Sequence, residues 1–325
     1  MPILDAETRV KNLQQNAVLL SVSRGRLRTT KRISSSSVQS DADPDILHVS
    51  KDFLESDKLD AIGKLNNKIG TFLSRICLPG PFKTGMYLLP VRLIDSTLKQ
   101  LEVDKAELTI LAEEFMAFYV EAHKFAQADD VEATLMLDAN PGLAKFATSK
   151  AQLGSLWNPT DYPAPDQVRA RFFFDFSVME MQTPGKLKAI SKELYQRELE
   201  KIQNVWEGAT EKITGVLMEE FQKLTSNLAE RLTPGEDGKQ KSLRASTLKK
   251  MNDWCSLFDA RNLSSDEQLS AMVDKARKLV NGIDLDNLKD DVAVREELSK
   301  DMQGLVEEVN AAIIDRPARR MDFTE

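Results

Sequence analysis

The sequence predicts a mainly α-helical protein in which long helices form antiparallel hairpins or a bundle, together with one small β element. Three observations lead to this fold class. Apolar residues recur at helical spacing over 94–126 and 187–232. Only 14 Gly and 12 Pro occur in 325 residues, so few turns are forced. Two short segments, near 17–23 and 171–179, have the composition of strands instead.

The first predicted strand is an apolar run from Ala17 to Ser23, and it leads directly into a basic arm, Arg24–Arg32. Five cations and no acid occur in those nine residues: Arg24, Arg26, Arg28, Lys31 and Arg32. Because the three arginines alternate, they project from one face of an extended chain. Guanidinium groups in such a row suit phosphates or a partner rich in carboxylates. The polar residues 34–46 that follow are expected to form a loop or linker.

Two interpretations of the basic arm remain open. In one, its cations contact a partner or phosphate groups. In the other, they lie over or pair with acidic helices of the same molecule, because 51 acidic side chains outnumber 44 basic ones and the formal net charge is -7. No second stretch of comparable positive density occurs in the sequence. This distribution favours a protein partner over nucleic acid.

The first long apolar pattern predicts a helix that begins near Ser50, as N-cap, and ends before Pro79-Gly80-Pro81. The helix predicted over 94–126 is more regular, because its apolar positions alternate between steps of three and four residues. Such steps define a heptad seam, as in a coiled coil, and Lys105 is its one polar interruption. The seam comprises Ile94, Leu98, Leu101, Leu108, Ala112, Phe115, Tyr119, Ala122 and Ala126.

Residues 131–157 carry a shorter helical pattern that is broken at Asn140-Pro141-Gly142, and three prolines mark a loop over 158–165. A second strand follows, in which alternate apolar residues are expected to face the core: Phe172, Phe174, Phe176 and Val178. Phe173 and Asp175 are expected on the opposite face. Core packing of these rings is favoured over a base-stacking platform. We expect this strand to pair with Val18–Val22.

The last predicted long helix runs from about Lys186 to Leu232, with apolar steps of about 3.75 residues, which favours a straight rod over a continuous left-handed coiled coil. Shorter helices are predicted over 243–259, 265–281 and 287–314, with Ser265 at the start of the second. We therefore expect four segments. They are an N-terminal strand with basic arm and linker (1–47), a helical domain with the aromatic strand (48–182), a long-helix bundle (183–314) and a flexible tail (315–325).

Catalytic and metal-binding signatures are missing from the sequence. Gly80 to Gly85 resembles a phosphate loop, but Phe82 replaces the glycine needed before the lysine and Pro81 removes an N–H donor. Cys77 and Cys255 lie among apolar neighbours and are expected to be buried, inert thiols. His48 and His123 are too few for a multi-histidine metal site. We expect no catalytic residues, no cofactor and no metal.

The composition predicts a protein with a sizeable core that does not enter membranes. Apolar residues make up 42% and charged residues 29% of the chain. The first 20 residues lack the apolar core of a secretory signal, and no stretch approaches 18 consecutive apolar residues. We therefore expect a cytoplasmic protein with no membrane partner, and two cysteines fit a reducing compartment.

Several segments together resemble a known family. They are the strand that enters a Gly-centred basic turn (Leu20 to Arg28), the segment Gly85-Met86-Tyr87-Leu88-Leu89-Pro90, the long helix with Phe115 and Tyr119, and the stretch Tyr162 to Phe172. This pattern, over roughly residues 15–300, resembles a helical family of uncharacterised proteins from bacteria, phages and mobile elements, catalogued as a domain of unknown function. The Tyr-Pro to Arg-Phe stretch is its most specific part.

The resemblance implies an accessory role in an ATPase-driven assembly, because family members are often encoded beside a MoxR-type AAA+ ATPase and a von Willebrand A-domain protein. It brings no catalytic residues. We expect a non-enzymatic helical scaffold or adaptor of a phage or bacterial mobile element, located in the host cytoplasm, with a protein partner such as the AAA+ ATPase. A homo-oligomer is a further alternative. The alternative function is a nucleic-acid-associated protein that binds phosphates through Arg24–Arg32.

Overall fold

The computed structural model describes residues 6–39, 41–43, 45–81, 85–180, 186, 189–235, 240–281, 283 and 292–314. It confirms a mainly α-helical fold with a small antiparallel β element. The chain forms two compact units, each assembled from separate stretches of sequence. The first unit comprises Met1–Leu20, Arg75–Ile94 and Val178–Glu325, and the second comprises Ser21–Ser74 and Asp95–Ser177.

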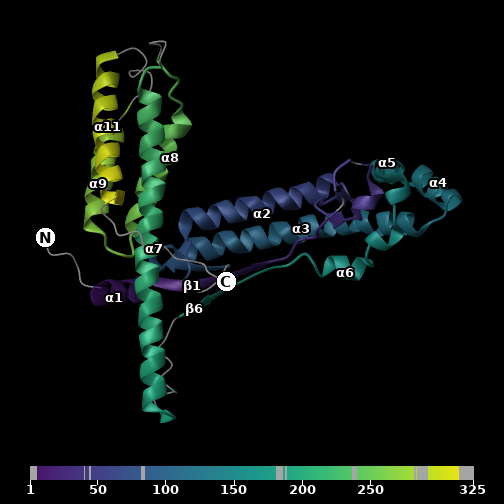
Figure 1. Cartoon of the computed structure of the whole chain (residues 1–325), viewed down its shortest axis with the longest axis horizontal. Helices are drawn as coiled ribbons and strands as arrows, with labels where there is room; N and C mark the ends of the chain where they lie inside the picture. Colours follow the sequence, from purple (N-terminus) through teal and green to yellow (C-terminus); the bar gives the residue numbers. More distant parts are fainter. Residues whose placement is uncertain are drawn as a thin grey trace. The chain divides into compact units, whose positions relative to one another are not determined.

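The first unit is built around α7 (Lys192–Leu232), against which α8 (Ala245–Arg261), α9 (Glu267–Val280) and α11 (Val292–Ile314) pack (Figure 1). The helix α11 is antiparallel to α7, because Gln222 bonds to Asn310 whereas Thr233 bonds to Ser299. A shorter helix, α1 (Ala6–Asn16), also packs on α7. One apolar core runs between these helices, and its fully buried residues include Ile213, Leu217, Phe221, Leu228, Leu269, Met272 and Val309.

A four-stranded sheet has the order β4 (Leu78–Pro79), β5 (Met86–Pro90), β1 (Ala17–Arg24) and β6 (Phe174–Met179). Strands β4 and β5 are antiparallel, with Leu78 opposite Leu88. Both of these leucines are fully buried in the core of the first unit. Strands β1 and β6 are neighbours in the sheet, so the predicted pairing of the two sequence-identified strands is confirmed.

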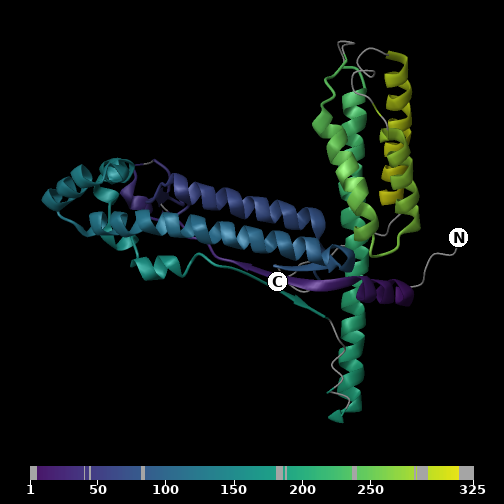
Figure 2. The ribbon, with the colours of Figure 1, turned by 180° about the vertical axis from the view of Figure 1, so that it is seen from behind.

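The second unit contains an antiparallel pair, α2 (Asp57–Ile76) and α3 (Ile94–Gln127), in Figure 1. Figure 2 shows the two helices side by side from behind. The Nζ atom of Lys68 lies 3.3 Å from Asp104 Oδ1 and 3.1 Å from Glu107 Oε2 across this pair. The shorter elements of this unit are β2 (Thr30–Arg32), β3 (Ser50–Asp52), α4 (Asp130–Ala139), α5 (Ala144–Leu153) and α6 (Pro165–Arg169).

Aromatic rings form the core of the second unit. The ring of Phe146 lies at its centre, with ring centroids 5.2 Å from Tyr162 and 5.5 Å from Trp157. The hydroxyl of Tyr119 in α3 donates to the carbonyl of Pro163 at 2.9 Å. The loop over 158–165 is therefore packed against Phe146 of α5 and hydrogen-bonded to α3 through Tyr119.

The heptad seam predicted in α3 is correct in its period and partly wrong in its residues. Leu101, Leu108, Phe115, Tyr119, Ala122 and Ala126 are buried as expected. Ile94, Leu98 and Ala112 are only half-buried, whereas Thr97 and Asp104 are buried. The polar position of the seam is therefore Asp104, whereas the sequence predicted Lys105 there. A carboxylate can occupy a buried seam position when neighbouring groups bind it. Here Gln100 Nε2 donates a hydrogen bond to Asp104 Oδ1, and Lys68 forms an ion pair with the same oxygen.

Three predicted helix starts are wrong. Ser50 does not cap α2, because 50–52 pair with 30–32 as strand β3. The long C-terminal helix begins at Lys192 rather than Lys186, with the Ser191 hydroxyl accepting from the N–H of Leu194. In α9 the capping side chain is Asp266 rather than Ser265, whose φ of 52° lies in the left-handed region. Strand pairing and cap geometry decide these starts, and apolar spacing is blind to both.

The aromatic strand alternates only in part. Phe174 is buried, and Phe173 and Asp175 are exposed on the other face as expected. Phe172 and Phe176 are half-buried, and Val178 is 38% exposed, so the expectation that Val178 faces the core is wrong. The rings at Phe172 and Phe174 nevertheless pack inward, as a strand that covers α3 requires.

The two units differ from the four contiguous segments that the sequence suggests. The N-terminal 47 residues form no unit of their own, since the boundary falls within β1 after Leu20. The boundary near 177 lies close to the expected one at 182. Strand pairing brings remote segments together, which linear composition does not reveal. The predicted tail at 315–325 lies outside the described residues. Within the described part of the chain, no helix is long and apolar enough to span a bilayer.

Candidate functional site

The basic arm does not form one continuous cationic surface, and its first member, Arg24, is engaged within the second unit. Its Nη1 atom donates to the backbone carbonyl of Asn66 in α2 at 2.7 Å. The guanidinium group lies over Gly70, where a Cβ atom would be 3.9 Å from both terminal nitrogens. Arg24 therefore ties the end of β1 to α2.

Lys31 belongs to an ion cluster around a buried carboxylate. Lys31 and Lys51 are directly opposite each other in the β2–β3 pair, and both reach the carboxylate of Asp161. The Nζ atom of Lys51 lies 2.6 Å from Asp161 Oδ2, and the Asp161 side chain is 1% exposed. Burial alone would raise the pKa of this carboxyl, but hydrogen bonds from Lys31 and Lys51 outweigh burial and lower its pKa. The cluster holds the β2–β3 pair to the loop over 158–165.

Arg32 lies on the outside of the same strand pair and contacts a histidine. Its Nη2 atom is 2.7 Å from Nδ1 of His48. A guanidinium group can only donate, so Nδ1 of His48 is the acceptor in this contact. Both side chains are part of the exposed surface. His48 therefore pairs with the basic arm and does not face a carboxylate as a general base would.

The remaining two members of the arm are free. Arg26 and Arg28 are exposed, and neither forms a hydrogen bond or an ion pair with any residue that the structure describes. The sequence-derived site of Arg24, Arg26, Arg28, Lys31 and Arg32 thus divides into three engaged cations and two available ones. The first group has partners within the molecule, but among the described residues only Lys31 pairs with a carboxylate, and this carboxylate, of Asp161, belongs to a loop rather than to a long acidic helix.

Gly25, which precedes Arg26, packs against an exposed aromatic ring. Its N–H donates to the carbonyl of Phe173 at 2.8 Å. A Cβ atom at position 25 would lie 2.1 Å from the Arg171 carbonyl and 2.5 Å from the Phe173 ring, so only glycine fits. Phe173 is 42% exposed, and Arg171 is exposed as well. The chain at Gly25 is therefore held against residues 171–173, and the exposed Arg26 follows this contact directly.

A groove of about 210 Å³ lies beside this ring, between α3 and residues 169–175. Its lining mixes apolar and charged side chains: Lys105, Leu108, Thr109, Ala112, Glu113, Met116, Arg169, Phe172, Phe173, Phe174 and Asp175. The charged ones pair with each other, Lys105 with Asp175 at 3.1 Å and Arg169 with Glu113. The groove itself therefore presents little uncompensated charge.

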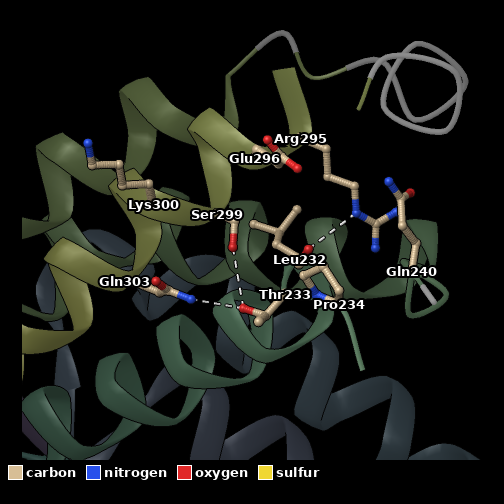
Figure 3. Close-up of a pocket in the computed structure, with 9 residues that line it drawn as sticks. All are labelled: Leu232, Thr233, Pro234, Gln240, Arg295, Glu296, Ser299, Lys300 and Gln303. Carbon is tan, nitrogen blue, oxygen red and sulfur yellow. Dashed lines mark hydrogen bonds between the residues drawn. The ribbon is translucent and has the colours of Figure 1, made fainter. Parts of the chain in front are cut away.

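The first unit holds a separate polar pocket of about 280 Å³ between the end of α7 and one face of α11 (Figure 3). The hydroxyl of Thr233 accepts from Gln303 Nε2 at 3.0 Å and lies 3.3 Å from the Ser299 hydroxyl. The complete lining is Leu232, Thr233, Pro234, Gln240, Arg295, Glu296, Ser299, Lys300 and Gln303.

Arg295 closes one side of this pocket and completes the end of α7. It is 4% exposed, and its Nε atom donates to the carbonyl of Leu232 at 3.3 Å. Its Nη2 atom donates to the carbonyls of Arg231 at 2.8 Å and Lys241 at 2.5 Å. The last carbonyls of a helix lack intrahelical partners, and they carry partial negative charge that attracts a cation.

A second buried arginine belongs to the core of the first unit. Arg261 is 1% exposed, and its two terminal nitrogens bind both carboxylate oxygens of Glu220 at 2.6 and 3.0 Å. Trp254 Nε1 donates to the same carboxylate at 2.7 Å. This geometry is a bidentate pair completed by an indole donor, and it links α7 to α8.

The two cysteines are free and buried, as the sequence predicts. Burial raises the pKa of Cys77 to about 12 and that of Cys255 to about 11. Such thiols are protonated at neutral pH, so they are poor nucleophiles. His123 is half-buried and stacks on Tyr119, with ring centroids 6.2 Å apart. Over the described ranges, no three His, Cys, Asp or Glu side chains converge as a metal site requires.

The segment that superficially resembles a phosphate loop joins two strands. Gly80 donates its N–H to the carbonyl of Met86 at 3.1 Å, and a Cβ atom at Gly80 would lie 2.4 Å from that oxygen. Residues 82–84 lie outside the described residues. A phosphate loop must lead into a helix whose N-terminus faces the phosphate, whereas this segment leads into β5.

Sequence reasoning missed Asp161, Lys51, Arg261 and Arg295. Each is an ionisable residue in an otherwise unremarkable polar stretch, and its partners are remote in sequence. The sequence carried one signal for Arg295. This residue precedes Leu298 by three residues and Met302 by seven, so it lies on the buried face of α11. Comparison of the chain with known protein families, curated proteins and solved structures finds no match. The family resemblance therefore stays a prediction.

Proposed function

We propose that this protein is a non-enzymatic helical scaffold or adaptor that binds a helix of a protein partner along the N-terminal part of α7. One observation carries the proposal. None of the side chains over 192–205 is buried, whereas buried side chains recur through the rest of the helix from Trp206 to Leu232. Among the described residues, this stretch of about 14 residues thus receives only partial cover, whereas α8, α9 and α11 bury one face of the remaining part.

The uncovered part continues the apolar stripe of the covered part. Tyr195, Leu199 and Ile202 precede Trp206 and Ile213 at steps of four and three, which keeps all five on one face of a helix. Ile202 packs against the core of the first unit, and Tyr195 and Leu199 are half-buried one and two turns beyond it. Because helices cover this same stripe farther along, a helix is the partner element that fits it.

Energetics favour occupation of this stripe. Residues 192–205 extend a helix that the packed part of α7 already nucleates, so helix propagation and a few tertiary contacts hold them. Complete burial of one large apolar side chain contributes roughly 1.5–3 kcal/mol. A partner helix that covers Tyr195 and Leu199 would therefore stabilise this part of α7 while it binds.

Charged residues beside the stripe neutralise one another. Lys201 Nζ donates to Glu198 Oε1 at 2.7 Å, and Arg197 lies 3.9 Å from the same oxygen. Hydrogen bonding from Lys201 lowers the pKa of Glu198, so this carboxylate stays ionised at neutral pH. The stripe therefore has no single-sign border, which favours an apolar contact over one steered by charge.

The resemblance described above suggests the identity of the partner. On that basis we propose a MoxR-type AAA+ ATPase assembly of a bacterium, phage or mobile element, acting in the cytoplasm. The interface would use an amphipathic helix of the ATPase or of its von Willebrand A-domain partner. No catalytic role is assigned to the present chain, because the buried ionisable groups described above have structural partners.

A photo-crosslinking experiment tests the proposal. A benzophenone amino acid replaces Tyr195 in the full chain, and crosslinked peptides are identified after irradiation in the native host. We expect crosslinks to a helix of a AAA+ assembly protein, their loss in L199E, and their retention in N204E. Asn204 is exposed on the other side of the same turns, so N204E is matched in charge. Crosslinks only to a second copy, or none at all, would contradict the proposal.

A second candidate function, binding of single-stranded nucleic acid, is favoured by one separate observation. Arg26, Arg28 and Arg171 are exposed and have no side-chain partner among the described residues, and Gly25, which precedes Arg26, packs against the exposed ring of Phe173. Phosphates suit the arginines and a base can stack on the ring. The net charge of -7 opposes non-specific attraction, so the site would have to act locally.

Fluorescence anisotropy with a labelled single-stranded oligonucleotide tests this candidate between 50 and 200 mM salt. Loss of two phosphate contacts in R26A/R28A should reduce the slope of log affinity against log salt by about 1.4. The control K58A/K64A removes two exposed lysines of α2 in the same unit. Equal binding by the arginine variant and the wild type would exclude the arm as the site.

A further inference from the structure

Arg295 is a buried cation that no carboxylate neutralises within the described part of the chain. Its three protein contacts are backbone carbonyls near the end of α7, with Leu232, Arg231 and Lys241. The C-terminus of a helix carries about half an elementary negative charge, so these carbonyls offset only part of the guanidinium charge. Glu296 is the adjacent residue, but Figure 3 marks no hydrogen bond between its carboxylate and Arg295.

Part of the guanidinium group remains available. It has five N–H donors, of which one on Nε and two on Nη2 are directed at carbonyls. The Nη1 atom has no hydrogen-bond partner among the described residues. It is also not one of the buried atoms that lack both a partner and solvent contact. Within that part of the chain, the guanidinium therefore keeps two unpaired donors on a residue that lines the pocket.

The pocket around this group is lined by apolar groups as well as by several polar and charged side chains, and its size suits a small ligand. A volume of about 280 Å³ holds a molecule of a few carbon atoms with one or two acidic groups. Lys300 contributes a second positive charge to the lining, against the single carboxylate of Glu296. Ser299 and Gln303 are held by hydrogen bonds to Thr233, so this wall is already ordered.

We propose that this pocket binds a small oxyanion, with a carboxylate or phosphate group accepting from Nη1 of Arg295. Gln240, which lies next to the guanidinium group in Figure 3, supplies a further amide donor. A charge-assisted hydrogen bond to a largely buried guanidinium is stronger than one to an exposed cation. The site lies in the first unit and is independent of the proposed partner contact and of the basic arm.

Calorimetry and thermal unfolding of the full chain test the site. Inorganic phosphate and succinate are titrated separately against chloride at constant ionic strength, which distinguishes the phosphate source from the dicarboxylate source. We expect a saturable heat with at least one of them, and a melting temperature raised by about 3 °C or more at 100 times Kd. Absence of a saturable effect from both anions would overturn the proposal.

Two variants and one control locate the binding. R295M removes the guanidinium and should abolish binding, and circular dichroism shows whether α7 and α11 still fold. K300E leaves the end of α7 intact and should weaken binding by about fivefold or more. The control K250E changes an exposed lysine of α8 outside the pocket by the same charge. Equal weakening by K300E and K250E would contradict the pocket and indicate a general charge effect.

Discussion

The helices α3 and α7 have the same kind of sequence pattern, but they are covered over different fractions of their length. In α3 buried residues extend from Thr97 to Ala126, almost the whole helix. In α7 they begin only at Trp206, so 192–205 carries the stripe without the cover. The cover of α3 includes α2 and the aromatic loop and strand of the second unit.

The comparison teaches that an apolar stripe predicts a helix and a face, but not what covers the face. Regular spacing is a property of one segment, whereas burial also requires a partner segment. α3 obtains its partner within the chain. Within the described residues, the beginning of α7 is covered only in part, and this difference underlies the proposed adaptor role.

The largest expected effect contrasts two positions of α7. Phe221 is fully buried and its ring stacks on Trp254, with centroids 5.3 Å apart. F221A should lower the free energy of unfolding by about 4 kcal/mol, because it leaves a cavity. L199A should lower it by less than about 1 kcal/mol. Urea unfolding measures both, and similar losses would mean that 192–205 is covered in the free protein.

The next effect concerns the loop that covers α3. D161N should destabilise the second unit by about 3 kcal/mol at pH 7, because it leaves Lys31 and Lys51 without their carboxylate. The matched control D57N alters an exposed pair with Lys145 and should leave unfolding nearly unchanged. Equal midpoints for D161N and wild type in urea would show that the loop is held by its rings alone.

The same carboxylate predicts a pH dependence. The pKa of Asp161 is lower in the folded state than its ordinary value, so folding favours the ionised form. The resulting stability is complete above the unfolded pKa of about 3.9 and is lost as the pH falls through the lower folded pKa. The stability difference between wild type and D161N should therefore shrink below about pH 4. A constant difference down to pH 2 would contradict this assignment.

A smaller effect of opposite sign is expected at Asp104 in the α3 seam. This side chain is 1% exposed, and its Oδ2 atom has no hydrogen-bond partner among the described residues. D104L should stabilise the protein by about 1 kcal/mol, since it removes a poorly satisfied buried carboxylate. E102L, at an exposed position of the same helix, is the control. A loss of more than about 2 kcal/mol in D104L would show that the contact with Lys68 is a strong one.

The smallest expected effect concerns the two cysteines, whose thiols should not react in the folded protein. Cys77 and Cys255 should resist alkylation by iodoacetamide at pH 8 in the folded protein, because burial raises both pKa values and blocks access. In urea both should react completely. Mass spectrometry counts the labelled thiols, and rapid labelling of Cys255 in the native state would show that the covered part of α7 opens readily.

The sequence predicted the helices well where apolar residues recur regularly. It placed α3 within one residue at its C-terminal end and α7 correctly at Leu232. It missed α1, β2, β3 and the β4–β5 pair, each of which is short and depends on contacts with remote segments. A three-residue strand has too few side chains to display a period.

The sequence identified the cations of the candidate site, but it did not reveal which of them have partners within the molecule. The alternation of arginines in Arg24–Arg32 suggested that they share one face. Within the described part of the chain, Arg26 and Arg28 have no partner, whereas a helix carbonyl engages Arg24, a buried carboxylate engages Lys31 and His48 engages Arg32. A carboxylate 130 residues away cannot be inferred from the arm itself.

The sequence by itself determined that this protein is mainly helical, which faces of its long helices are apolar, and that its thiols are buried. These properties follow from the order of side chains within one segment, and local geometry fixes their spacing. Tertiary structure decided which stripe is covered, which cations are paired, and that Arg295 meets the end of α7 beside a pocket. Those outcomes depend on groups that only folding brings within a few ångströms of each other, where charge and burial act.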